Sequence, residues 1–496
     1  MAYQIPYNQP RIYVNYASWL QRIGAITRNS MFYYRDGSSQ SVGSDWSFHS
    51  SSNQTKSGIW ELEPHNYYRL FPSLELADYA GDYNTFYMRQ YVSEQVEDVN
   101  DTLNPIYNVR SRLLNNVLES MEYEGNGYFA MLGSNLFEKG LMCKFVLSYY
   151  VMNAEKTDYE RNADGTIKTG HATMKLEPLY NCTQNAGGYY IQPNSNGTFI
   201  AKITNATTDI RKIDVQSINC LLLDKNYVWD NPDTVDVDEG VSASALQGGT
   251  YDDIKIGSIS YGTYWDFPVN CDMNLNFTRD YKGVKASRSL GGYDTTNINY
   301  TGAPAWGTGS AWEDELQPYY PHIDVVDGVA DADGNSWASD MGIDTHTGFV
   351  NNSTISEETN RRTFEAFKRT GRRSWKLDFK GLRDYQIMGE NESNYNNHHY
   401  TTATNYGTNY YVDSSPTDEV HTSLEPDAWL SSLHTRNDDF FSQVLNKTYG
   451  AEKFIFQPDK EDFSSLAIAK FDQSSFNFKQ SNHKFFDIGL KIEEVW

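Results

Sequence analysis

The end of the chain alternates between apolar and polar side chains, and this alternation limits what the C-terminal part can become. Apolar residues occupy every second position in Phe486, Ile488, Leu490 and Ile492. A period of two matches a strand with one buried face, and the register of such a strand is strongly specified. We therefore expect the chain to end in a strand that is built into a sheet.

The same alternation occurs twice earlier in this half of the chain. In the segment Cys271–Phe277 the apolar residues at alternate positions are Met273, Leu275 and Phe277. In the segment Arg373–Phe379 they are Trp375, Leu377 and Phe379. Amphipathic strands of this kind favour an antiparallel sheet with one face on a core.

One helix is predicted between the second and the last of these strands, over Asn437–Gly450. Its apolar face consists of Phe440, Phe441, Val444, Leu445 and Thr448. Acidic residues lie in the first turn and Gly450 follows the last, as is typical of helix ends. Several strands with one covering helix predict a mostly-β domain.

Six sequence blocks in this half resemble tail structural proteins of long-tailed bacteriophages. The blocks are Asp272–Leu275, Lys285–Trp306, Gly371–Leu377, Asp439–Val444, Ala469–Phe476 and Leu490–Trp496. The resemblance covers residues 254–496. It implies a distal-tail or baseplate ring protein with a tail-tube-like fold, which is a β-sandwich or half-barrel with a flanking helix.

The middle of the chain contains short β-type runs separated by Gly, Asn and Asp turns. The runs are Gly127–Asn135, Met142–Val151, Gly188–Ile191, Gly197–Ile203 and Val215–Leu223. Strands at this spacing favour a sandwich, and their order is similar to a jelly roll of the carbohydrate-binding or galectin type. We place this domain at residues 118–230. It is inserted between residues 1–117 and 254–496 of the tail-type domain, with residues 231–253 as a linker.

The net charge of −24 opposes direct binding to nucleic acid, because affinity for DNA comes mainly from neutralising phosphates with Lys and Arg. The four cysteines are not at metal-ligand spacing, which favours buried thiols made in a reducing cytoplasm. No apolar run is long enough to cross a membrane, and no signal segment is recognisable, so we expect no membrane insertion.

No motif reaches the threshold for catalysis or for a cofactor. Asp331–Asn335 has the carboxylate spacing of a calcium loop, but Gly342 stands where a bidentate Glu is needed, so a turn is favoured. A zinc-protease helix motif, a phosphate-binding loop and a nucleophile elbow are all missing from the sequence. We expect a protein that is not an enzyme.

Contacts between copies are expected at two kinds of residue. One is a basic cluster of Arg361, Arg362, Lys368, Arg369, Arg372 and Arg373, which is either a solvated strand edge or the partner of acidic loops on an adjacent chain. The other is a Tyr-rich loop with Tyr395, Tyr400, Tyr410 and Tyr411. This loop spans residues 389–426, and a second long loop spans residues 307–358. Long loops inside compact domains are usually functional or disordered.

Three functions follow as alternatives. The first is a structural ring component of a phage tail tip or baseplate, made in the bacterial cytoplasm and incorporated into the virion, where it contacts copies of itself and other tail proteins. The second is an adhesin that binds host surface glycan through Tyr189, Tyr190 and Trp229, unless these aromatics belong to a core. The third is a tail-associated glycan hydrolase.

Overall fold

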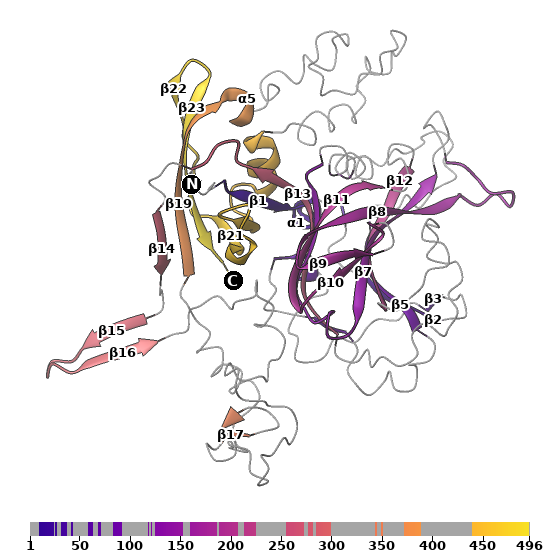
Figure 1. Ribbon diagram of the computed structural model, residues 1–496, viewed down its shortest axis with the longest axis horizontal. Coiled ribbons are helices and arrows are strands. Elements are labelled where there is room, and N and C mark those ends of the chain that lie inside the picture. The colour runs from indigo at the N-terminus through magenta and orange to yellow at the C-terminus, as the bar shows by residue number, and fades with distance from the viewer. Residues whose placement is uncertain are drawn as a thin grey trace, which may run out of the picture.

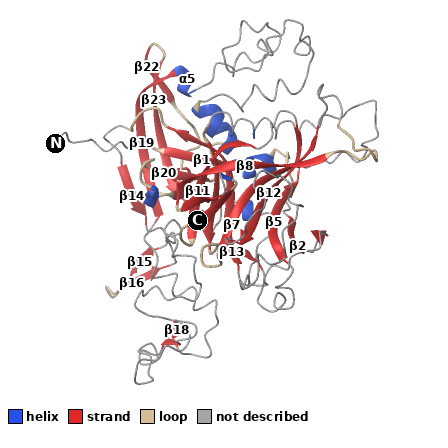
Figure 2. Ribbon diagram, turned by 45° about the vertical axis from the view of Figure 1, so that its right-hand side comes forward, coloured by secondary structure: helices blue, strands red, loops and turns tan. Residues whose placement is uncertain are grey.

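The computed structural model is mostly β, and all of the strand pairs it describes are antiparallel (Figures 1 and 2). The structure describes residues 9–23, 25–26, 31–36, 41–42, 58–62, 68–70, 83–91, 118, 121, 125–151, 159–185, 188–206, 213–224, 254–271, 276–280, 284–298, 343–344, 349–350, 372–387 and 439–495. The prediction of a mostly-β fold is confirmed.

The strands up to residue 224 are β1 (Arg11–Asn15), β2 (Met31–Asp36), β3 (Ser41–Val42), β4 (Tyr68–Leu70), β5 (Tyr83–Tyr91), β6 (Gly127–Ser134), β7 (Leu141–Val151), β8 (Thr169–Tyr180), β9 (Cys182–Asn185), β10 (Tyr190–Pro193), β11 (Gly197–Ala206) and β12 (Ile213–Asp224). Those that follow are β13 (Ile254–Asp266), β14 (Asn276–Asp280), β15 (Val284–Arg288), β16 (Asp294–Ile298), β17 (Ile343–Asp344), β18 (Phe349–Val350), β19 (Arg372–Arg383), β20 (Phe454–Gln457), β21 (Ala467–Phe471), β22 (Phe478–Asn482) and β23 (Phe485–Glu494). The helical elements are α1 (Tyr16–Arg22), α5 (Asp384–Ile387), α8 (Asn446–Thr448), the 3-10 turns η1 (Gly58–Trp60) and η9 (Phe463–Ser465), and the π-helix η8 (Phe441–Leu445).

One continuous run of paired strands connects the two halves of the chain. The order along this run is β3, β2, β5, β12, β7, β8, β11, β6, β13, β1, β20, β21, β23, β19 and β14. The N-terminal strand β1 lies between β13 and β20, so it joins the strands from the middle of the chain to those from the C-terminal part.

The strands from β5 to β13 in this order form a strongly curved group, drawn at the right of Figure 1. Aromatic rings from separate strands meet inside it. Phe145 on β7 lies 5.2 Å from Phe129 on β6 and 5.4 Å from Tyr261 on β13, measured between ring centroids. The Tyr261 hydroxyl donates to Gln90 on β5 at 3.1 Å, which links opposite ends of the curved group across its interior. The group therefore encloses a large part of the main apolar core.

The strands at the centre of the run are buried on both faces. On β6, Phe129 and Met131 belong to the main core, whereas Tyr128 and Ala130 belong to a second core on the opposite face. On β1, Tyr13 belongs to the second core. Strands that are covered on both sides read as continuous apolar runs, which explains why β6 shows no alternation in its sequence.

The predicted C-terminal strands are confirmed. Trp375, Leu377 and Phe379 on β19 are buried and lie opposite Ile492, Leu490 and Ile488 on β23. The predicted strand at Cys271–Phe277 overlaps β14, which begins at Asn276, five residues after the start of the prediction. Its apolar positions Met273 and Leu275 lie outside the described residues.

The predicted helix is also observed, and it contains a π-helical turn at η8 followed by α8. Tyr449, at its C-terminal end, adopts the left-handed conformation with φ of 51°, and Gly450 follows with φ of 63°. The helix packs against β1, β13 and α1. Because it is enclosed by these elements, Gln443 and Lys447 are buried along with the predicted apolar face, of which only Phe441 is partly exposed.

The predicted domain boundaries cross paired strands. The five strands β12, β7, β8, β11 and β6 lie within residues 118–230 and pair with one another in that order. At the two sides of this set, β12 also pairs with β5 and β6 also pairs with β13. Independent folding of residues 118–230 stays a prediction. The predicted linker 231–253 lies outside the described residues, as do the two predicted loops, except for the short hairpin of β17 and β18 within 307–358.

Candidate functional site

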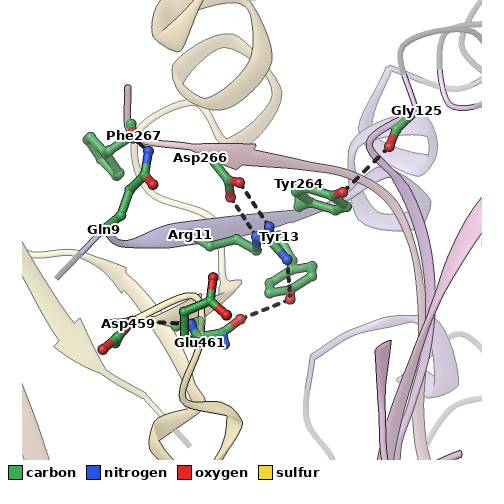
Figure 3. A network of polar contacts seen from close by, with 10 residues as sticks. Gln9, Arg11, Tyr13, Gly125, Tyr264, Asp266, Phe267, Asp459 and Glu461 are labelled. Atoms are coloured by element: carbon green, nitrogen blue, oxygen red, sulfur yellow. Dashed lines mark hydrogen bonds and ion pairs between the residues drawn. The ribbon is translucent and has the colours of Figure 1, made fainter. Parts of the chain in front are cut away.

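A polar network lies where β1 joins β13, at the junction between the two halves of the sheet (Figure 3). Arg11 donates to Asp266 through two nitrogens, Nε to Oδ1 at 2.5 Å and Nη2 to Oδ2 at 2.8 Å. The guanidinium carbon also lies 4.0 Å from the centre of the Tyr264 ring. Burial disfavours the charged form of Arg11, but the hydrogen bonds and charge interactions with Asp266 and Tyr13 together outweigh this, and the pKa of Arg11 is raised. The guanidinium of Arg11 therefore stays charged and binds the Asp266 carboxyl group through two nitrogens.

Further contacts of the same segment attach it to β20. The Tyr13 hydroxyl donates to Gln457 on β20 at 2.9 Å, and burial raises the pKa of Tyr13 to about 12. The backbone of β1 and β13 is also close at Gly262. A Cβ added there would lie 2.0 Å from the carbonyl oxygen of Val14, so a larger residue would separate the two strands. The junction depends on both its polar pairs and this glycine.

A second network surrounds Lys447 in the helix. Its amine donates to the hydroxyl of Tyr16 at 2.5 Å and to Oε1 of Gln443 at 2.6 Å. The Tyr16 hydroxyl lies 2.7 Å from Oγ1 of Thr263 on β13. Lys447 is 1% exposed. Its amine is therefore positioned to fix the helix on α1 and β13, and no solute reaches it in this structure.

Other titratable groups with shifted pKa values are buried in the curved group. Burial lowers the pKa of Lys144 on β7 to about 8, and its amine lies 5.3 Å from the centre of the Tyr190 ring. Burial raises the pKa of Cys182 to about 11 and also raises those of Cys143 and Cys220. Because the thiolate is the nucleophilic form, these protonated thiols are suited to packing and not to catalysis.

The described part of the chain contains no group of three or more His, Cys, Asp or Glu residues able to hold a metal ion. Among the same residues, no helix is long and apolar enough to cross a membrane.

Of the basic cluster, the structure places Arg373 fully. Its guanidinium pairs with Glu494 at 2.7 Å and also donates to the carbonyl oxygens of Ser465 and Leu466, at 3.1 and 2.8 Å. These contacts lie within the chain, so the guanidinium of Arg373 is already occupied and does not serve as a free cation for another copy. Arg372 lies opposite Asp280 in the pairing of β19 with β14. The other predicted contact residues, Arg361, Arg362, Lys368, Arg369, Tyr395, Tyr400, Tyr410 and Tyr411, lie outside the described residues.

The prediction that Tyr189 and Tyr190 contact a glycan is wrong, because both side chains are buried. Tyr189 and Tyr190 are only 6% and 1% exposed, so neither ring presents a face on which a sugar can stack. The amines of Lys175 and Lys144 lie over these two rings, at 5.0 and 5.3 Å from their centres. The core alternative stated for these aromatics is the one observed. Trp229 lies outside the described residues.

The residues of the junction were not found from the sequence. Arg11 and Asp266 are 255 positions apart, and neither belongs to a local motif. The available signal is one charged residue at one end of each strand, Arg11 at the start of β1 and Asp266 at the end of β13, which indicates an ion pair only once the two strands are known to be neighbours.

Comparison with protein-family models, curated proteins and solved structures gives no significant match.

Proposed function

We propose that this protein is a non-enzymatic structural component of a bacteriophage tail tip or baseplate. In this role it forms a ring that connects the tail tube to host-recognition or baseplate proteins. The supporting observation is that four of the sequence blocks that resemble phage tail proteins, although far apart in the chain, fall on elements that pack together in the C-terminal part.

The contacts between these blocks run from one to the next. Trp375, in the block Gly371–Leu377, lies opposite Ile492, in the block Leu490–Trp496, across β19 and β23. Ile492 also lies opposite Phe471 on β21. The ring of Phe471 is 6.3 Å from that of Phe440 in the helical block. Residues that share one core are the ones that a common fold requires, and this supports a tail-tube-like domain at residues 254–496.

The chemistry of the described residues supports a structural role. The lysine and cysteines with shifted pKa values, such as Lys144 and Cys143, are buried, and so is the hydrogen-bonded amine of Lys447. A polar group in such a position stabilises the fold when it is hydrogen-bonded, but it cannot meet a substrate. We propose no catalytic site.

The negative charge of the chain limits how copies of it can assemble into a ring of subunits. Subunits that each carry −24 repel one another unless opposite charges meet at their interfaces. Screening reduces this repulsion over a Debye length of about 8 Å at physiological salt, but apolar area must also be buried for a stable contact. The predicted basic cluster around Arg369 and Arg372 supplies positive charge for such an interface.

The test is a charge reversal in that cluster. The double variant Arg369→Glu, Arg372→Glu should remain folded as a monomer but lose assembly, measured by sedimentation velocity and by incorporation into virions. A matched control reverses Lys479 and Lys491, which are exposed on β22 and β23, to Glu. Assembly of the Arg369, Arg372 variant at the wild-type level would show that the cluster is only a solvated surface.

A further inference from the structure

The strands β15 and β16 form a hairpin that is separate from the main sheet. The five pairs of this ladder run from Val284 with Ile298 to Arg288 with Asp294, and they constitute a two-stranded sheet of their own. Figure 1 shows the hairpin extending from the region of β14 away from the rest of the molecule. Two strands alone are marginally stable in water, so such an arm gains from being covered.

The tip of the hairpin is held by its own contacts. The backbone N–H of Ser289 donates to the carbonyl of Tyr293 at 2.8 Å, and the N–H of Gly292 donates to the carbonyl of Ser289 at 2.9 Å. Arg288 donates to both carboxylate oxygens of Asp294, at 2.8 and 3.2 Å. Gly292 adopts φ of 81°, a conformation that favours glycine. The tip thus has a defined shape before it meets any partner.

Two large apolar side chains project from this tip. Leu290 is 110% exposed relative to its reference state and Tyr293 is 71% exposed, the two highest values for large hydrophobic residues in the described part of the chain. All nine residues from 286 to 294 are exposed. An isolated exposed apolar residue is ordinary, but a leucine and a tyrosine presented together on a preformed arm are typical of a contact surface.

The charge of this region differs in sign from that of the remaining chain. Residues 276–298, which include β14 and the hairpin, contain four Lys or Arg and two Asp, a net charge of +2. The whole chain carries −24, which leaves −26 for all other residues. A basic arm on an acidic molecule is complementary to the surface of another copy of the same molecule.

We propose that the hairpin of β15 and β16 is an assembly arm that docks on the acidic surface of a second copy of this chain. Leu290 and Tyr293 at its tip supply the apolar contact, and the net positive charge of residues 276–298 steers the approach. An arm that contacts a different surface on the neighbour makes a heterologous interface, and repetition of such an interface closes a ring when the rotation allows it. This inference rests on the proposed ring function and identifies one of its interfaces.

The first experiment measures self-association of the full chain by sedimentation velocity over a range of concentrations. The double variant Leu290→Ser, Tyr293→Ser should raise the dissociation constant at least about tenfold, because two buried apolar side chains are lost from the contact. The control variant Phe137→Ser, Tyr385→Ser removes two exposed aromatics elsewhere, which are 47% and 52% exposed, and should leave the constant unchanged. Association of the unaltered chain should weaken as salt is raised from low to high concentration.

The second experiment identifies what the tip touches. A photo-reactive benzoylphenylalanine in place of Leu290 should cross-link two copies of the chain, and mass spectrometry of the product should locate the site in an acidic peptide of the neighbour. Cross-linking only within one chain, or none above that of the same probe in place of Phe137, would overturn the proposal.

The outcomes separate this proposal from the proposed function. If the unaltered chain assembles and the Leu290→Ser, Tyr293→Ser variant assembles equally well, the proposed assembly arm is wrong, whereas the proposed ring function is not contradicted. If the unaltered chain stays monomeric at every concentration and is missing from virions, both are overturned.

Discussion

Phe379 on β19 lies directly opposite Ile488 on β23, and the two side chains are 0% and 3% exposed. The ring of Phe267, just after β13, stacks on that of Phe379 with centroids 4.1 Å apart. The last strand of the chain thus contributes its apolar face to the same core as the central strand β13. This pairing makes the C-terminal strand a structural element whose removal is costly.

We predict that Ile488→Ala lowers the free energy of unfolding by about 2 to 5 kcal/mol, because it leaves a cavity beside Phe379. The measurement is urea denaturation of the full chain. The control is Lys491→Ala, on the exposed face of the same strand, which should change the free energy by no more than about 0.5 kcal/mol. Equal stability of the Ile488 variant and the wild type would mean that this face of β23 is not part of a core.

The ion pair at the junction gives a second prediction. In Asp266→Ala the guanidinium of Arg11 remains largely buried without its carboxylate, which should cost about 3 kcal/mol. This is the lower end of the range for buried pairs, because the Asp266 side chain is 30% exposed. Thermal or urea unfolding of the full chain measures the loss.

An exposed pair in the same chain is the control for the junction. Arg288 and Asp294 are 72% and 64% exposed, so Asp294→Ala should cost at most about 1 kcal/mol. Replacing both junction residues, with Arg11→Met and Asp266→Leu, should restore most of the stability that Asp266→Ala loses. A double variant as unstable as the single one would show that the loss comes from packing and not from the unpaired charge.

The sequence predicts some of these strands and misses others. β19 and β23 were predicted because each has one buried face, so their alternation survives in the sequence. β8 was not predicted, although Ala172, Met174 and Leu176 alternate on its core face, because charged residues and a proline break the apolar run around them. Its period of two was the signal that could have found it.

What could not be predicted is which strands become neighbours. The pairing of Tyr13 with Tyr264 and Ile455 joins positions hundreds of residues apart, and no local preference encodes it. The burial of Lys447 has the same cause. Its environment is set by α1 and β13 packing around the helix, whereas its own sequence context predicts a solvated lysine.

Lys144 gives a prediction about pH. Burial lowers its pKa from 10.5 to about 8, so between these values the unfolded chain binds a proton that the folded chain has released. The contribution of this group to stability therefore rises with pH across that window. Below pH 8 both states are charged and the full penalty of burying the charge applies, about 3 kcal/mol.

The measurement compares Lys144→Met with the wild type by urea unfolding from pH 7 to pH 10.5. The variant should be more stable than the wild type at pH 7, and this advantage should shrink as the pH rises through the window. Taking the difference between the two proteins removes the opposite effect of the buried thiols, whose raised pKa values weaken folding at alkaline pH. Lys491→Met, at an exposed position, is the matched control for the substitution itself. A constant difference for Lys144→Met would contradict the lowered pKa.

The last prediction concerns residues 118–230 as an isolated fragment. Its strands β12, β7, β8, β11 and β6 keep all four of their mutual ladders, so we expect a cooperative melt. The fragment loses β5 beside β12 and β13 beside β6, and with β13 the ring of Tyr261 that packs on Phe145. Its outer strands then present unpaired edges, which should lower its melting temperature and cause it to self-associate. A longer fragment of residues 83–271 restores both ladders and should melt higher and remain dispersed. If the longer fragment folds and the shorter one does not, the curved group is a single unit that includes β5 and β13, and an inserted domain at residues 118–230 must be abandoned.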